Sequence, residues 1–365
     1  MLNHSESSSK SIIINNNFVV MDIETIKPNN EFIPYLICAY NGSDYISSFG
    51  NNQYELFSNF IKSLLTFFIK DNKTLVVYAH NFASFDGVLL LKHLIPFGKV
   101  EPLLFHGKLI TIKLKLDFEG HRGKTIIFKD SYLLLPFALR KLALIFNTSE
   151  NKGIFPFNLS NIFYSGLFPR FEYFININIA TYLKISQEFN NKTWNFKDEA
   201  IKYCKLDCLI LFEILIKFNE LVFNEFKINI NKVLTLPALS MKIFKTLFME
   251  NNTIYQIHGK VEKDIRESYT GGSVDVYIPH NRITSWFSNE SPQYETLYYY
   301  DVNGLYPYVM SNKSMSIGKP ISFEGDIRKL YPNAYGFFFC KITSPNNLEH
   351  LNLHKVKYSF YNLNL

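Results

Sequence analysis

The sequence predicts a mixed α/β fold built around a central sheet, and three features indicate it. Short apolar runs rich in β-branched and aromatic residues, such as FVVMD at 18–22 and TLVVYAH at 74–80, are typical of buried strands. Segments with apolar residues at helical spacing lie between and after these runs. The stretch LITIKLKL at 109–116 alternates strictly, and TIIFK at 125–129 follows it as the second strand of an expected hairpin. This alternation of element types favours a sheet covered by helices.

The expected elements follow one another through the first 225 residues. Strands are expected at 18–22, 34–40, 74–80, 109–116 and 125–129. Helices are expected at 54–70, 84–94, 132–146 and 198–223, the last being the longest. We expect a polar tail at 1–17, an α/β domain at 18–225 and a second region at 226–365. In the second region a linker precedes a strand-rich part that begins near residue 270.

Composition excludes several protein classes. The chain has 365 residues, 47% of them hydrophobic, and a net charge of +6, which excludes wholesale disorder and suits a polyanionic partner. The four cysteines are spread widely, so we expect neither a disulfide framework nor a zinc site. No apolar run approaches the ~20 residues of a membrane span. The first 17 residues lack the apolar core of a secretory signal and the Arg-rich pattern of a transit peptide.

The first acidic segment, MDIET, places Asp22 and Glu24 two positions apart at the end of an expected strand. Side chains at i and i+2 of a strand share one face. Two converging carboxylates suit a hard ion such as Mg²⁺, which takes oxygen ligands. Taken alone, the pair is better explained as two solvated carboxylates at a strand end.

The second acidic segment, YAHNFASFDG at 78–87, lies where an expected strand meets a helix. Asp86 is a candidate metal ligand, Asn81 a candidate hydrogen-bonding group, and Phe85 a candidate platform for a nucleic-acid base. The alternative is an Asx turn at a helix start with Phe85 in the core.

The third acidic segment, YCKLDC at 203–208, lies on the long expected helix. Tyr203 and Asp207 are four residues apart and therefore project from one face. Apolar neighbours predict that Asp207 is partly buried, and a buried carboxylate requires a partner or a metal ion. The alternative is an exposed helical Asp whose apolar neighbours lie on another face.

In chain order, the patterns DxE, Nx₃FD and Yx₃D resemble the proofreading 3′–5′ exonuclease domain of family B DNA polymerases. The resemblance implies a ribonuclease H-like DEDD exonuclease domain with a mixed central sheet. It also implies two Mg²⁺ or Mn²⁺ ions that activate water and stabilise the leaving oxygen of a phosphodiester. Tyr203 would orient the attacking water, and Asn81 and Phe85 would hold a single-stranded 3′ end. The metal ligands implied are Asp22, Glu24, Asp86 and Asp207.

Two further segments resemble those of the protein-primed members of this family. KDSYLLLPFALRKLA at 129–143 resembles the segment that binds single-stranded DNA, with Ser131 matching and Tyr132 standing where Leu is usual. NKGIF at 151–155 resembles a Lys-containing segment, which makes Lys152 a candidate catalytic phosphate ligand. The alternative for Lys152 is an exposed loop lysine.

A glycine pair lies in ESYTGGSVDVY at 267–277. Adjacent glycines allow a backbone to approach a phosphate chain closely, although a plain hairpin turn would use them as well. The segment resembles the YxGG link between exonuclease and polymerase domains. The resemblance implies that Tyr269, Gly271 and Gly272 contact primer-template DNA.

YYYDVNGLYPYVM at 298–310 resembles motif A of family B polymerases, which lies on a palm strand and the following turn. The resemblance implies that Asp301 is a catalytic ligand of Mg²⁺, assisted by the Val302 carbonyl. Tyr306 would stack under the sugar of an incoming deoxynucleoside triphosphate. Gly304 stands where Ser is usual, so one triphosphate contact would be weaker.

No DTD string, which would supply a second palm carboxylate, occurs after motif A. We therefore expect an N-terminal part of a polymerase, with a complete exonuclease half and no polymerase activity of its own. The resemblance favours the group encoded by linear mitochondrial plasmids, which implies a mitochondrial location and a terminal priming protein as partner. Two alternatives from other classes are a stand-alone DEDD exonuclease acting on RNA and a non-catalytic DNA-binding remnant.

Overall fold

The computed structural model describes residues 13–69, 73–117, 120–150, 152–175, 177–190, 192–250, 255–269, 298–315, 318–339 and 360–361. The chain divides into two units, one reaching to Met249 and the other beginning at Glu250. The first unit holds nearly all of the buried residues, and its fold positions the candidate site.

A seven-stranded sheet forms the centre of the first unit, in the order β3-β2-β1-β4-β7-β6-β5. β1 pairs with β4 and β4 pairs with β7 in parallel, whereas the other neighbours are antiparallel. The expected α/β fold with a mixed central sheet and a β6–β7 hairpin is therefore confirmed. The strands are β1 (Val19–Ile26), β2 (Ile33–Tyr40), β3 (Tyr45–Phe49), β4 (Thr74–Ala79), β5 (Gly98–Phe105), β6 (Lys108–Leu116) and β7 (Thr125–Asp130).

Helices of the first unit lie mainly between and after these strands. They are α1 (Gln53–Leu64), α2 (Asp86–Leu91), α3 (Leu139–Ile145), α4 (Ile179–Glu188), α5 (Phe196–Phe226) and α6 (Leu236–Ile243). A π turn at Leu65–Ile69 extends α1, and a 3₁₀ turn at Lys92–Phe97 extends α2. A two-stranded ribbon of β8 (Ser165–Gly166) and β9 (Trp194–Asn195) leads into α5. Asn195 starts α5 by accepting a hydrogen bond from the Asp198 N–H.

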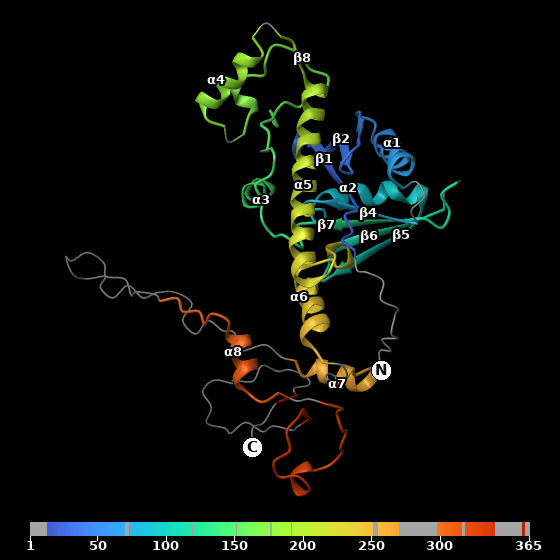
Figure 1. The fold of residues 1–365 in the computed structure, drawn as a ribbon, viewed down its shortest axis with the longest axis vertical. Helices are drawn as coiled ribbons and strands as arrows, with labels where there is room; N and C mark the ends of the chain where they lie inside the picture. Colours follow the sequence, from blue (N-terminus) through green and yellow to red (C-terminus); the bar gives the residue numbers. More distant parts are fainter. Residues whose placement is uncertain are drawn as a thin grey trace, which may run out of the picture. The chain divides into compact units, whose positions relative to one another are not determined.

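Two hydrophobic cores lie on the two faces of the sheet. In β1, Val19, Met21 and Ile23 pack into the core that includes residues of α1 and α2. Val20 belongs to the opposite core, which includes the buried stripe of α5. Successive strand residues face opposite sides, so the even-numbered positions of β1 face α5. Figure 1 shows α5 as the long helix that runs beside the sheet.

Several element predictions for the first unit were incomplete, and α4 and α6 were not predicted. The expected helix at 132–146 begins only at Leu139, because Pro136 lacks an N–H group and disfavours helical geometry at Leu135. β3 and β5 were not predicted. β5 contains Pro102, which is tolerated because β5 is an edge strand.

The second unit contains α7 (Gly259–Glu267), α8 (Leu305–Asn312) and a short pairing of β10 (Phe338–Phe339) with β11 (Phe360–Tyr361). The strand expected around Asp301 is not present: residues 298–303 form no strand, and α8 begins two residues after Asn303. A strand requires a neighbour for its backbone groups, and the described residues offer none to this segment. The strand-rich part expected from residue 270 begins at 270–297, outside the described residues. Within the described ranges 298–315 and 318–339, β10 is the one strand, so the expectation is not met there.

Candidate active site

Two acidic side chains of β1 lie on the face of the sheet that α5 covers. Asp22 and Glu24 alternate with Met21 and Ile23, which are buried in the opposite core. One carboxyl oxygen of each lies within 4.8 Å of the other. Glu24 is only 8% exposed and Asp22 is partly exposed, so the pair is largely shielded from water and is not a solvated strand end.

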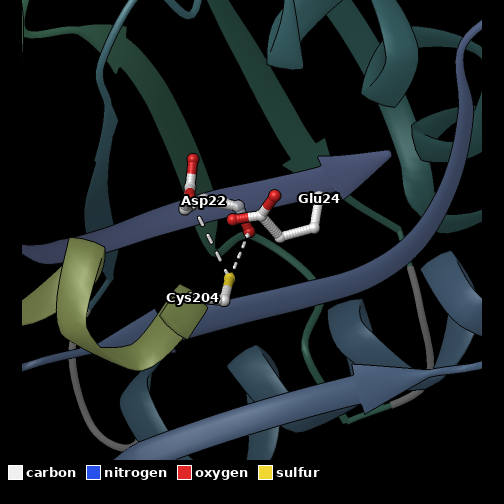
Figure 2. A group of neighbouring side chains, drawn as sticks. All are labelled: Asp22, Glu24 and Cys204. Carbon is white, nitrogen blue, oxygen red and sulfur yellow. Dashed lines mark hydrogen bonds between the residues drawn. The ribbon is translucent and has the colours of Figure 1, made fainter. Parts of the chain in front are cut away.

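The α5 helix brings a second set of polar groups to this pair. Tyr203, Cys204 and Asp207 are all buried, and Asp207 is 4% exposed. The Cys204 thiol donates to the Asp22 main-chain oxygen, with Sγ 3.6 Å away, and lies 3.9 Å from Asp22 Oδ2. Figure 2 shows Cys204 reaching from α5 toward Asp22 and Glu24 on the neighbouring strand. The predicted burial of Asp207 is therefore confirmed.

Asp86 approaches the same strand from the first turn of α2. Its Oδ1 accepts a hydrogen bond of 3.1 Å from the Ile23 N–H. β4 pairs with β1 only at Val19 and Val20. Farther along β1, at Ile23, the Asp86 carboxylate accepts the hydrogen bond that a neighbouring strand would otherwise accept. Gly87 permits this turn, because a Cβ there would lie 2.8 Å from the Phe82 main-chain oxygen.

A single ammonium group lies against the carboxylates. Lys152 Nζ is 2.9 Å from Asp207 Oδ2 and 5.5 Å from the ring centroid of Tyr203. The segment that carries Lys152 passes close to α5 because Gly153 follows it. A Cβ on Gly153 would lie 3.1 Å from Tyr203 Cδ2. Lys152 is thus an ion-pair partner inside the cluster rather than an exposed loop lysine.

Burial and mutual repulsion shift the ionisation of this cluster. Burial, followed by the charge of Asp207, raises the pKa of Asp22 to about 6. Burial and the charge of Asp22 raise the pKa values of Glu24 and Asp86 as well. Burial alone would lower the pKa of Lys152, but Asp207, Asp22 and Glu24 outweigh it and the pKa rises.

Two further observations indicate a shortage of positive charge at this site. Asp207 Oδ1 is buried and has no hydrogen-bond partner among the described residues. Among the described residues, Lys152 is the cation that pairs with Asp207 and whose charge opposes the raised pKa values of Asp22 and Glu24. One positive charge thus faces four carboxyl groups. Oxygen-rich, negatively charged and partly shielded clusters suit hard divalent cations. The residues present therefore fit such an ion.

The loop between β4 and α2 is held by Asp130 at the end of β7. The Asp130 carboxylate accepts hydrogen bonds from the N–H groups of Asn81, Ala83 and Tyr132, at 3.0, 2.8 and 2.8 Å. Asn81 is exposed and has a left-handed backbone conformation with φ 66°, which Asn tolerates better than most residues. This arrangement fixes the backbone between the sheet and Asp86.

An aromatic pair lies beside this loop. The rings of Phe85 and Phe32 meet edge to face with centroids 5.2 Å apart. Phe32 is 48% exposed, and Lys27 Nζ lies 4.9 Å from its ring centroid. Phe85 is only partly buried, so it is not a core residue.

Ser131 lies beneath the surface next to the same loop. It is 1% exposed. Its hydroxyl is 3.1 Å from the Ala79 main-chain oxygen and 2.9 Å from His80 Nδ1. His80 Nε2 is in turn 2.9 Å from the Phe137 main-chain oxygen. The hydroxyl is thus engaged within the protein, while Tyr132 beside it is 39% exposed.

Sequence reasoning missed three residues of this neighbourhood: Cys204, Asp130 and Phe32. Cys204 lies three residues before Asp207, which places both on one helical face. Asp130 ends a strand that runs parallel to β4, which places it at the same sheet edge as the 80–85 loop. Only this strand pairing, which was not predicted from the sequence, could have indicated it. Phe32 lies in a connection whose position the sequence did not indicate.

The remaining predicted residues lie elsewhere. Tyr269, Asp301, Val302 and Tyr306 belong to the second unit and are all exposed. The described part of that unit has no buried carboxylate near Asp301. Gly271 and Gly272 fall outside the described residues.

Comparison with known proteins identifies the family. The family model described as DNA polymerase type B, organellar and viral, matches residues 65–362. The chain belongs to this family of type B DNA polymerases. The family prediction made from the acidic and aromatic motifs is therefore confirmed.

Curated relatives of this organellar and viral type B chain are fungal. A probable DNA polymerase of Ascobolus immersus is 30% identical over 339 residues, which cover 89% of this chain and 27% of the relative. One of Neurospora intermedia is 29% identical, covering 88% of this chain and 34% of the relative. The chain thus spans about a quarter to a third of the length of these relatives.

The fold is shared with solved polymerase structures. One is phi29 DNA polymerase complexed with primer-template DNA and incoming nucleotide substrates. The match covers 95% of this type B chain and 56% of the phi29 polymerase chain, with a TM-score of 0.53 and 17% identity. The binary complex with primer-template DNA gives a TM-score of 0.50 and 18% identity. Within the described residues, no helix combines the length and apolar character that crossing a membrane requires.

Proposed function

We propose that the first unit is a ribonuclease H-like DEDD exonuclease that removes nucleotides from the 3′ end of DNA for proofreading. The observation that carries the proposal is the convergence of four carboxyl groups from β1, α2 and α5 on one face of the sheet. These groups come from segments up to 185 positions apart (207 − 22). Burying these carboxyl groups beside one lysine lowers the stability of the fold. A functional role of the carboxyl groups explains why they are present despite this cost.

The donor set fits two Mg²⁺ or Mn²⁺ ions held by Asp22, Glu24, Asp86 and Asp207. Every carboxylate is an oxygen ligand, and the unpartnered Asp207 Oδ1 offers a further coordination position. When bound, such ions supply an activated water and stabilise the leaving oxygen of a phosphodiester.

Tyr203 and Lys152 would assist from the α5 side. Burial and the charge of Asp207 raise the pKa of Tyr203 above its usual value, so its hydroxyl remains protonated and can donate a hydrogen bond to an attacking water. The Lys152 ammonium is held at the cluster by Asp207 and can offset negative charge on a phosphate.

The substrate end would lie over the loop between β4 and α2. Asn81 offers an exposed amide, and Phe85 and Phe32 offer partly exposed rings on which an unpaired base can stack. Ser131 would act by holding His80 and the strand end below this loop. Single-stranded 3′ ends of DNA are therefore the proposed substrates.

For the whole protein we infer template-directed DNA synthesis from deoxynucleoside triphosphates. Asp301, Val302 and Tyr306 would form part of the polymerase site, and Tyr269, Gly271 and Gly272 would contact primer-template DNA. A terminal priming protein is the inferred partner and the mitochondrion the inferred location. Membership of the organellar and viral family supports this proposal.

The test is hydrolysis of 3′- and 5′-labelled single-stranded DNA by the purified chain with Mg²⁺. We expect stepwise loss from the 3′ end, reduced at least about a hundredfold by Asp22→Ala combined with Glu24→Ala. Glu101→Ala is the matched control, because Glu101 is a carboxylate on β5 that pairs with Lys115 far from the cluster.

The same assay separates the alternatives. DNA binding without cleavage would contradict the proposal and support a non-catalytic remnant. A strong preference for RNA over DNA would support a stand-alone ribonuclease instead.

A further inference from the structure

The carboxylate pair of β1 has a sulfur ligand beside it. One ligand atom from each of Asp22, Glu24 and Cys204 lies within 4.8 Å of the others, and no other such group of three occurs among the described residues. Figure 2 shows the thiol and both carboxylates directed toward one another. Hard ions such as Mg²⁺ have little affinity for sulfur, whereas Zn²⁺ binds thiolate, imidazole and carboxylate alike.

We propose that Asp22, Glu24 and Cys204 form a site for a thiophilic divalent ion of the zinc class, which excludes the hard ion from the same carboxylates. Binding replaces the S–H bond of Cys204 with a sulfur–metal bond, and the proton passes to solvent. No electron transfer is involved.

One sulfur–oxygen pair has nearly the spacing of a tetrahedral zinc site, and the other pairs of ligand atoms lie within 4.8 Å of one another. With Zn–S of about 2.3 Å and Zn–O of about 2.1 Å, a sulfur and an oxygen ligand are about 3.6 Å apart. Cys204 Sγ is 3.9 Å from Asp22 Oδ2, so a few tenths of an ångström of side-chain movement suffice. Both side chains are carried by regular elements, β1 and α5.

The surroundings favour an additional cation independently of the thiol. Asp207, three residues after Cys204, has the buried Oδ1 that is without a partner among the described residues. Its charge acts on both Asp22 and Glu24. Two other buried thiols, Cys38 and Cys208, lie next to Cys204, so a thiophilic ion has an apolar, water-poor wall on that side.

The consequence for the proposed exonuclease is inhibition by zinc. An ion tied to Cys204 would occupy the Asp22–Glu24 position with three protein ligands. A tetrahedral zinc ion then keeps one position for water or phosphate, whereas an octahedral Mg²⁺ ion on the same two carboxylates keeps several. Inhibition rests on the proposed function, whereas binding of the ion does not.

The test uses the full chain, freed of metal, and Co²⁺ as a spectroscopic substitute for Zn²⁺. We expect a thiolate-to-cobalt charge-transfer band in the near ultraviolet at one equivalent, which Zn²⁺ removes and Mg²⁺ does not. Cys204→Ser should abolish the band and weaken Zn²⁺ binding at least about tenfold. Cys208→Ser is the matched control, because Cys208 is an equally buried thiol on the same helix that is not in the ligand group. Cys340→Ser excludes a contribution from the fourth cysteine.

Each possible result of these experiments either supports or contradicts the proposed site. Absence of the band in the wild-type chain, or its persistence in Cys204→Ser with unchanged thermal unfolding, overturns the site. Zn²⁺ should inhibit Mg²⁺-dependent hydrolysis in wild type and Cys208→Ser, and at least about tenfold less strongly in Cys204→Ser. If the cobalt band forms but Mg²⁺ supports no hydrolysis, the proposed exonuclease function is contradicted and the metal site is not. If hydrolysis occurs but no cobalt band forms, the metal site is contradicted and the exonuclease function is not.

Discussion

Individual carboxyl groups in this site are held at a cost to folding. Asp22, Glu24 and Asp86 all have raised pKa values because burial disfavours their charged forms. Only Lys152 offsets them among the charges that act on Asp22 and Glu24. A protein retains such groups when their ligand-binding role outweighs the loss of stability, as at many catalytic sites.

This cost should be visible as a pH dependence of stability in the metal-free chain. Asp22 has a pKa of about 6 in the folded state, whereas in the unfolded chain it has the usual aspartate pKa of 3.8. Stability therefore falls as pH rises through this window. Relative to Asp22→Asn, the wild type should lose about 1 kcal/mol of unfolding free energy between about pH 5 and pH 7.5. Urea unfolding in EDTA at the two pH values measures this difference.

Comparison with Asp22→Asn cancels the contributions of groups on which the charge of Asp22 does not act, such as His80. Burial lowers the pKa of His80, which makes stability rise with pH in both proteins alike. Added Mg²⁺ should stabilise the wild type at about pH 7.5 more than it stabilises Asp22→Asn. Parallel pH profiles of the two proteins would contradict a buried, repelled Asp22.

At the scale of elements, local periodicity predicted most of the sheet but not all of its edges. The apolar runs of β1, β2 and β4 and the hairpin of β6 with β7 have strong periodic signals. β5 carries Pro102, and β3 is short with the polar pair Ser47–Ser48, so neither gives a clear strand pattern. α3 was predicted too long because the effect of Pro136 was not taken into account.

The same contrast applies to the candidate site. Asp22, Glu24, Asp86, Tyr203 and Asp207 were predictable because their spacing follows strand and helix periods. Asp130 and Cys204 required the tertiary arrangement. Asp130 lies near the site because β7 runs parallel to β4. Cys204 lies near Asp22 because α5 crosses the sheet over that residue.

Asp130 offers a test of how the loop between β4 and α2 is held. Asp130→Ala removes the acceptor of three backbone N–H groups and should lower the unfolding free energy by about 1–3 kcal/mol. The amide protons of Asn81 and Ala83 should exchange faster, as hydrogen–deuterium exchange would measure. Asp117→Ala is the control, because the exposed Asp117 pairs only with exposed Arg122 and should change stability by less than about 0.5 kcal/mol. Equal exchange rates in both variants would mean that the loop is ordered without Asp130.

At the scale of the whole molecule, the two units differ in how far their acidic groups are assembled. The first unit gathers four carboxyl groups around β1. In the second unit, Asp301 lies on a segment that is neither paired as a strand nor buried among the described residues. Phosphoryl transfer by two ions requires more than one carboxylate, and the sequence carries no DTD string after Asp301.

The 365-residue chain should therefore degrade 3′ ends without extending them. A labelled primer-template with Mg²⁺ and all four deoxynucleoside triphosphates measures both reactions. Asp22→Ala combined with Glu24→Ala prevents degradation from masking synthesis, and this variant should add no nucleotides. Asp301→Ala should leave the rate of degradation unchanged, since Asp301 belongs to the other unit. Template-dependent extension by the exonuclease-deficient chain, abolished by Asp301→Ala, would show instead that these residues already form a working polymerase site.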